Sequence, residues 1–141
     1  MVQSIDVRTQ PELTAGLRMG PAYQAYQILH YGFAALPIIF GIDKYFHLLC
    51  NWDLYLTPLV PKITGIAAYP FMLAVGVIEI IAGLIVAVRP RIGAYIVAAW
   101  LVGIIVNLLL VPGYFDVALR DFGLCLGALA LARLSQVYSR P

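Results

Sequence analysis

The chain has 141 residues, of which 62% are hydrophobic and 11% are charged, and its formal net charge is +2. A soluble domain carries roughly 25% charged residues, and a domain this short buries only ~60–70% of the surface that its unfolded chain exposes. These values exclude an ordinary water-soluble fold and indicate that lipid covers the apolar surface. The small net charge, without a run of Lys or Arg, argues against nucleic acid as a partner.

Residues 1–22 are predicted to form a cytoplasmic or interfacial segment. Thr9 and Glu12 have the spacing of a capping box, which predicts a short helix to about Arg18 on the membrane surface. Gly20-Pro21 ends it. A cleavable signal peptide has an apolar stretch near its start, which this segment lacks, so we expect the first membrane helix to be an uncleaved insertion signal.

Four apolar stretches follow, each long enough for the ~20 residues that a membrane-crossing helix needs. Strands are not expected, because lipid does not tolerate open sheet edges. The expected fold is therefore all-α: a polytopic membrane protein in which 23–138 forms a four-transmembrane-helix bundle behind a short N-terminal interfacial helix. The predicted spans are 23–49, 68–88, 92–111 and 117–138.

The connections between these spans differ in length. Loop 50–67 is the longest and contains Pro58 and Pro61, which predicts an ordered loop on the membrane surface. Arg89-Pro90-Arg91 and Pro112-Gly113 leave only very short turns, so the last three helices are expected to be antiparallel neighbours.

Basic residues are unevenly distributed between the two predicted sides of the membrane. By the positive-inside rule, this bias places both termini in the cytoplasm and loop 50–67 outside, most simply in a bacterial inner membrane. The terminal side holds Arg8, Arg18, Arg89, Arg91, Arg133 and Arg140, and the loop side holds Lys44, Lys62 and Arg120.

Glu79 is the ionisable residue placed deepest in a predicted span. It lies about eleven residues into 68–88, or ~16 Å along the helix and near the midplane. Gly76 and Gly83 share its helix face and predict close approach of another helix. An intramembrane carboxyl suggests a functional site, here a proton relay or a quinone contact. The alternative is a protonated Glu79 that hydrogen-bonds a neighbouring helix.

Polar residues from three spans are predicted to form an outer polar layer, within ~6–8 Å of the span ends next to the loop side. Its members are Asp43, Lys44, Asn107, Arg120 and Asp121. Pairing Lys44 with Asp121, and Asp43 with Arg120, would neutralise all four charges. The layer is interpreted either as ion pairs that fix helix register or as an outward-opening pocket for a polar headgroup, a quinone ring or a small anion.

Gly123 and Gly127 form a GxxxG motif in 117–138. This motif favours helix packing, inside the bundle or with another chain. No Cys/His cluster has the spacing of a zinc or iron–sulfur site, so no metal site is expected. No serine-hydrolase triad, Walker loop or dinucleotide motif is present either, so catalytic residues are not assigned.

The histidines and cysteines are too far apart to act in pairs. His30 and His47 are seventeen residues apart on one predicted helix, or ~25 Å, so they cannot bind one haem together. Cys50 and Cys125 are predicted to differ in depth by ~13 Å, which is too far for a disulfide.

The order of these features resembles the DoxX-like family of small four-helix membrane proteins. The resemblance covers about residues 25–135, and it implies a membrane subunit beside an oxidoreductase, including thiosulfate:quinone oxidoreductase. It implies a redox context but no particular reaction. The residues that carry it are Gly41-Ile42-Asp43-Lys44, Glu79 with Ala82-Gly83-Leu84, and Ala118-Leu119-Arg120-Asp121.

Three functions are consistent with these features. The first is an accessory or anchoring subunit of a membrane-bound redox or electron-transfer complex, with other membrane subunits and lipids as partners. The second is a quinone-interacting oxidoreductase subunit, and the third is a small-molecule or ion carrier. Whether the chain is itself an enzyme stays open, with a non-catalytic role favoured. It is expected to bind no cofactor alone, and a quinone or a lipid between the helices is left open.

Overall fold

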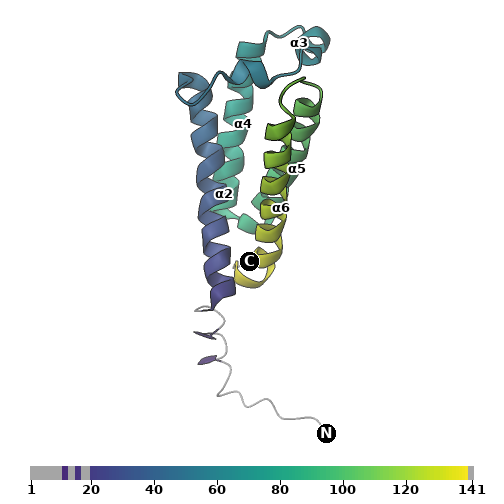
Figure 1. The fold of residues 1–141 in the computed structure, drawn as a ribbon. Coiled ribbons are helices and arrows are strands. Elements are labelled where there is room, and N and C mark those ends of the chain that lie inside the picture. The colour runs from purple at the N-terminus through teal and green to yellow at the C-terminus, as the bar shows by residue number, and fades with distance from the viewer. Residues whose placement is uncertain (1–10, 13–14, 17–19, 140–141) are drawn as a thin grey trace.

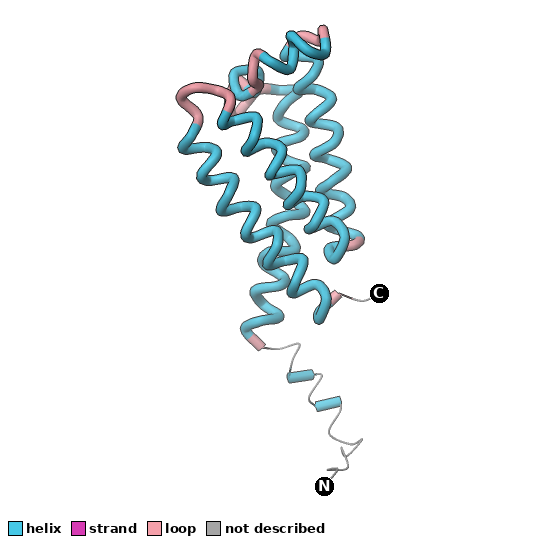
Figure 2. The backbone as a smooth tube through the Cα atoms, turned by 90° about the vertical axis from the view of Figure 1, so that its right-hand side faces the viewer, coloured by secondary structure: helices cyan, strands magenta, loops and turns pink. Residues whose placement is uncertain are grey.

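The computed structural model describes residues 11–12, 15–16 and 20–139. Most of the predicted N-terminal interfacial helix lies outside these residues. Within them the protein is all-α, without a strand. Figures 1 and 2 show long helices standing side by side, with two short helices across one end. In chain order the helices are α2 (Pro21–Phe46), the 3₁₀-helix η2 (Trp52–Tyr55), α3 (Leu59–Thr64), α4 (Ala68–Val88), α5 (Pro90–Leu109) and α6 (Phe115–Tyr138).

Prolines mark the start of two long helices, and a left-handed residue marks the end of one. Pro21 and Pro90 occupy first-turn positions of α2 and α5, where a missing N–H costs nothing. Helix α2 ends at Phe46 because His47 takes a left-handed conformation with φ of 52°, so it stops three residues before the predicted span 23–49. Pro37 lies inside α2 without ending it.

Three helices, α2, α4 and α5, are long and apolar enough to cross a membrane. Helix α6 has 24 residues and is longer than α4 and α5. It is less apolar, because Asp116, Arg120 and Asp121 lie in its first two turns and Arg133 lies near its other end.

The helices pack as two antiparallel pairs. Helix α2 packs mainly against α4 and α5 mainly against α6, while the contacts between the pairs are less extensive. The rings of Tyr23 and Tyr138 lie 5.5 Å apart, so α2 starts where α6 ends. We call this end of the bundle the terminal end, and the end that carries residues 47–67 the loop end (Figure 1).

Backbone contacts set the register between α2 and α4. A β-carbon at Gly41 would lie 2.5 Å from the Gly76 carbonyl oxygen, and one at Gly83 would lie 2.7 Å from the Ala34 carbonyl oxygen. Side chains larger than hydrogen do not fit at these positions. The two contacts are seven residues apart on each helix, or two turns, and so fix a heptad-like register along the pair.

This close approach gives a testable expectation for Gly41→Ala. Its added methyl group would collide with the backbone of α4, which should lower the free energy of unfolding by about 1–3 kcal/mol. Gly103→Ala is the matched control, since nothing lies within 4 Å of a β-carbon there and alanine favours a helix. Denaturant unfolding in detergent, followed by circular dichroism, measures both. Equal stabilities would contradict the close packing of α2 on α4.

The loop end is ordered by contacts with α5. The side-chain amide of Asn107 donates to the Tyr55 carbonyl oxygen at 2.6 Å and accepts from the Thr57 N–H at 2.9 Å. These two bonds hold the segment between η2 and α3 against the end of α5. Loop 50–67 thus contains two short helices and covers the bundle.

Candidate functional site

The only buried ion pair in the described part of the chain joins α2 and α4. Lys44 Nζ lies 2.6 Å from Glu79 Oε2. Lys44 is 3% exposed and Glu79 is 7% exposed. Charged groups this deeply buried are costly unless they are paired and hydrogen-bonded, and each of these two supplies the other's counter-charge.

The antiparallel geometry explains how residues at different depths meet. Lys44 lies three residues from Gly41 toward the loop end, and Glu79 lies three residues from Gly76 toward the terminal end. Their α-carbons are therefore offset by ~9 Å along the axis. Side chains on a helix tilt toward its N-terminus, so in antiparallel neighbours Lys44 and Glu79 lean toward each other. The long lysine side chain spans the remaining distance.

Asp43 and Trp52 cover the pair from the loop end. The ammonium of Lys44 lies 3.9 Å from the centroid of the Trp52 ring, within the range of a cation–π interaction. Trp52 Nε1 donates to Asp43 Oδ2 at 2.7 Å. Asp43 also accepts from the N–H groups of Leu48 and Leu49, which follow the end of α2. One carboxylate thus holds both the start of the loop and the indole above Lys44.

Helices α5 and α6 bring two further polar groups toward Glu79. Trp100 Nε1 is buried and lies near the Glu79 carboxyl, but it makes no hydrogen bond of standard geometry to a described residue. The carboxyl of Asp121 lies within electrostatic range of Glu79 and pairs with no basic residue that the structure describes. We call Lys44, Trp52, Glu79, Trp100 and Asp121 the Lys44–Glu79 centre.

The pairing predicted for the outer polar layer is wrong in both of its ion pairs. Lys44 pairs with Glu79 rather than with Asp121. Arg120 pairs with Asp116 at 3.3 Å, on an exposed face of α6, rather than with Asp43. The physical reason for the second error is that free N–H groups beyond the end of α2 compete for the Asp43 carboxylate.

The remaining predicted residues have separate positions. Asn107 holds the loop, as described above. Gly127 faces the ring of Phe33 on α2, and a β-carbon at Gly123 would have nothing within 4 Å. The GxxxG motif therefore contributes one glycine to packing inside the bundle.

Histidines and cysteines occupy four separate sites. His30 bonds to α4 near the terminal end, while His47 ends α2 and stacks on Tyr69. Cys50 and Cys125 are free thiols. Burial raises the pKa of the Cys50 thiol, which keeps it protonated and weakly nucleophilic at neutral pH. In the described ranges no group of three His, Cys, Asp or Glu residues is placed to hold a metal ion.

Sequence reasoning did not include Trp52 or Trp100 in the site, and it did not pair Lys44 with Glu79. A usable signal existed for the pair. Both residues are ionisable groups inside predicted spans, and Gly76, which shares the face of Glu79, marks where another helix comes close. No comparable signal pointed to the indoles, since tryptophan is common at membrane interfaces.

The centre offers one ammonium, two carboxyls and one unsatisfied indole N–H where four helices meet. Such a set can bind an acceptor oxygen at the indole, can exchange a proton through a carboxyl, or can hold the helix pairs together. No protein-family model, no characterised protein and no solved structure matches this chain.

Proposed function

We propose that α6 is a fourth membrane span and that both chain termini face the cytoplasm. Helix α6 is longer than α5 and packs antiparallel against it. Its charged residues lie near its two ends, which leaves an apolar middle from Phe122 to Ala132. The excess of arginine at the terminal end supports the orientation.

Labelling of single cysteines tests this topology. In a background without Cys50 and Cys125, a cysteine at Thr64, which is exposed in the loop, should react with an impermeant maleimide in intact cells. A cysteine at Ser139, just beyond α6, should react only after the cells are permeabilised. The opposite pattern would show that the orientation is the reverse of the proposed one. Labelling at both positions in intact cells would show that α6 does not cross the membrane.

The function we propose is a DoxX-like accessory or anchoring subunit of a larger membrane-bound redox complex. One observation carries this proposal. The three segments that resemble the family are distant in sequence, and each contributes to one place: Lys44 from the first, Glu79 from the second and Asp121 from the third. In the role proposed here, the Lys44–Glu79 centre holds the bundle in shape.

Exposed apolar side chains supply the surface that an anchoring subunit needs. Large side chains on several helices remain uncovered, including Ile39 on α2, Val102 on α5 and Phe122 on α6. Lipid or neighbouring membrane subunits would cover them.

Native purification tests the subunit role. The chain, extracted in a mild detergent, should co-purify in stoichiometric amount with a protein that carries a redox cofactor. Deletion of the chain should release that partner from the membrane fraction. Recovery as an isolated 15.5 kDa species, with the membrane's oxidoreductases unchanged, would overturn this assignment.

A quinone-interacting subunit is the second candidate, and a specific observation favours it. The buried Trp100 N–H has no partner of standard geometry, and a quinone carbonyl oxygen is an acceptor able to satisfy it. Trp100→Phe removes this N–H and keeps an aromatic ring. Quinone turnover reduced by about tenfold or more, with assembly intact, would support this candidate, because a lost hydrogen bond to a bound ligand costs about that much. Unchanged turnover would contradict this second candidate and leave the anchoring role as the proposed function.

A further inference from the structure

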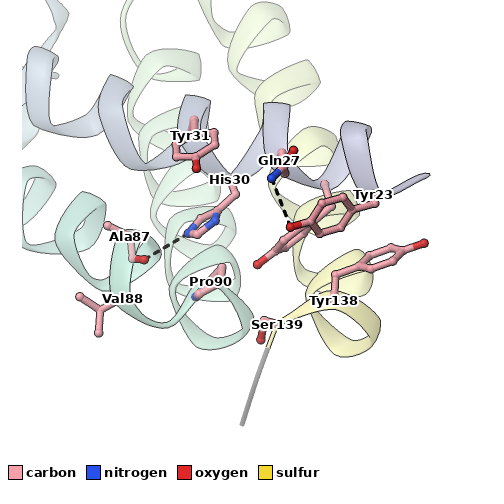
Figure 3. Close-up of a pocket in the computed structure, with 10 residues that line it drawn as sticks. Tyr23, Gln27, His30, Tyr31, Ala87, Val88, Pro90, Tyr138 and Ser139 are labelled. Atoms are coloured by element: carbon pink, nitrogen blue, oxygen red, sulfur yellow. Dashed lines mark hydrogen bonds between the residues drawn. The ribbon is translucent and has the colours of Figure 1, made fainter. Parts of the chain in front are cut away.

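The terminal end of the bundle contains a second polar site, well separated from the Lys44–Glu79 centre. A hollow of about 400 Å³ opens there between the start of α2, the turn from α4 to α5 and the end of α6 (Figure 3). Among the residues that the structure describes, no charged side chain lines it. Its lining residues include four tyrosines, a glutamine, a histidine and a serine: Tyr23, Tyr26, Tyr31, Tyr138, Gln27, His30 and Ser139. We call it the tyrosine pocket.

Several hydroxyl groups of the tyrosine pocket donate no hydrogen bond to a described residue. Tyr23 accepts a hydrogen bond from Gln27 Nε2 at 3.2 Å, which leaves its own hydroxyl hydrogen unused. The hydroxyls of Tyr26, Tyr138 and Ser139 donate to no described residue. A hydroxyl group carries one donor and prefers to use it. The pocket is therefore suited to a ligand rich in acceptor oxygens.

His30 keeps the walls of the pocket in place. Its Nε2 lies 2.9 Å from the Val86 carbonyl oxygen and 3.2 Å from that of Ala87, at the end of α4. A carbonyl oxygen only accepts, so Nε2 carries the hydrogen. The imidazole also stacks on Tyr26, with ring centroids 5.5 Å apart. The wall formed by α2 is thereby fixed to the wall formed by α4, without occupying the tyrosine hydroxyls.

The surroundings of the pocket are basic and apolar. Arg89 and Arg91 lie in the adjoining turn, and Arg133 lies in the last two turns of α6. Between Gly20 and Ser139, the acidic residues lie elsewhere: in the loop, in the parts of α2 and α6 nearer the loop end or, for Glu79, in the middle of α4. Val88 lines the pocket and is 79% exposed. Basic residues and tyrosines beside exposed aliphatic side chains are typical of a membrane–water boundary.

We infer that the tyrosine pocket binds the phosphate of a phospholipid headgroup. The phosphate oxygens accept from the hydroxyls of Tyr23 and Tyr26, and the arginines of the adjoining turn offset the negative charge. The acyl chains then lie along the exposed apolar surface beside Val88. This inference uses only the membrane location of the chain and is independent of the redox role.

A lipid titration of delipidated protein in mild detergent tests the inference. Native mass spectrometry measures the bound lipid. Phosphatidylglycerol should bind one to one, and a diacylglycerol of the same chains should not. The double variant Tyr23→Phe, Tyr26→Phe keeps the rings and removes two donors, and we expect its affinity to fall by about tenfold or more. Tyr69→Phe at the loop end is the matched control and should bind as the wild type does.

Each alternative result has a defined meaning. If inorganic phosphate displaces the lipid at similar concentration, the site serves a soluble phosphate and the lipid assignment is wrong. Equal binding of diacylglycerol, or unchanged lipid affinity in the double variant, would also overturn it. Should the double variant lose its helical circular dichroism, Tyr23→Phe alone replaces it, because Tyr23 lies in the first turn of α2. With that single variant, a loss of affinity supports the inference and unchanged affinity overturns it.

Discussion

Lys44→Met is expected to destabilise the bundle by about 3–5 kcal/mol, because it leaves the Glu79 carboxylate buried without its counter-charge. Methionine has a similar length and is apolar, so the loss reports the charge rather than a cavity. Unfolding in detergent, followed by circular dichroism as the denaturing detergent increases, measures the difference. The exposed pair of Arg120 and Asp116 is the matched control, and Arg120→Met should cost about 0–1 kcal/mol.

The double variant Lys44→Met, Glu79→Leu tests whether the two residues stabilise the bundle as a coupled ion pair or contribute to stability independently. Removing both charges leaves an apolar contact between α2 and α4, and replacing a buried pair in this way is often neutral or stabilising. We expect the double variant to be more stable than Lys44→Met alone. A double variant that loses the sum of both single losses would show that the pair is not coupled as the 2.6 Å contact implies.

The long helices were largely predictable because the bilayer imposes their length and composition. Helix α4 matches the predicted span 68–88 at both ends, since a proline-containing turn and an apolar run mark it clearly. The predicted start of α5 was two residues late because proline at its first position begins a helix instead of ending a turn. The end of α2 depends on one left-handed residue, His47, for which the sequence carried no signal.

The charged members of the candidate site were predictable, but its two tryptophans and its pairing were not. Glu79, Lys44 and Asp121 were singled out because charge inside a span is costly. Their pairing was inferred from the depth of each α-carbon, and this neglected the reach and tilt of side chains. A lysine extends far enough to meet a carboxylate two turns away, whereas Asp43 reaches only the backbone and the indole next to it. Side-chain reach, rather than depth, therefore decides the partners.

The Lys44–Glu79 centre and the tyrosine pocket differ in their chemistry and in their position along the bundle. Toward the loop end, Lys44 pairs with Glu79 and is covered by Trp52. At the terminal end, hydroxyl groups surround an open hollow. The first arrangement stabilises helix contacts from within, and the second offers donors to the membrane boundary. A subunit that is anchored beside other membrane proteins needs both a rigid bundle and a defined contact with lipid.

Asp43→Ala is expected to release the loop end as well as to destabilise the bundle. The carboxylate accepts hydrogen bonds from two backbone N–H groups and from Trp52 Nε1. Hydrogen bonds to a charged acceptor contribute about 1.5–3 kcal/mol each, and these are not additive. We therefore expect a total loss of about 2–4 kcal/mol, within the range for a broken buried network. Trp52 would also lose the bond that keeps its ring above Lys44.

Two measurements distinguish release of the loop from a general loss of stability. Protease cleavage within 50–67 should become faster in Asp43→Ala under conditions where α4 and α5 stay protected, and Trp52 emission should shift to longer wavelength as the indole meets water. Asp43→Asn is the matched control. Its amide oxygen still accepts from the backbone, so cleavage should lie between wild type and Asp43→Ala. If the loop of Asp43→Ala is as resistant as the wild type, then Asn107, which holds the Tyr55–Thr57 segment from α5, is sufficient to order it without Asp43.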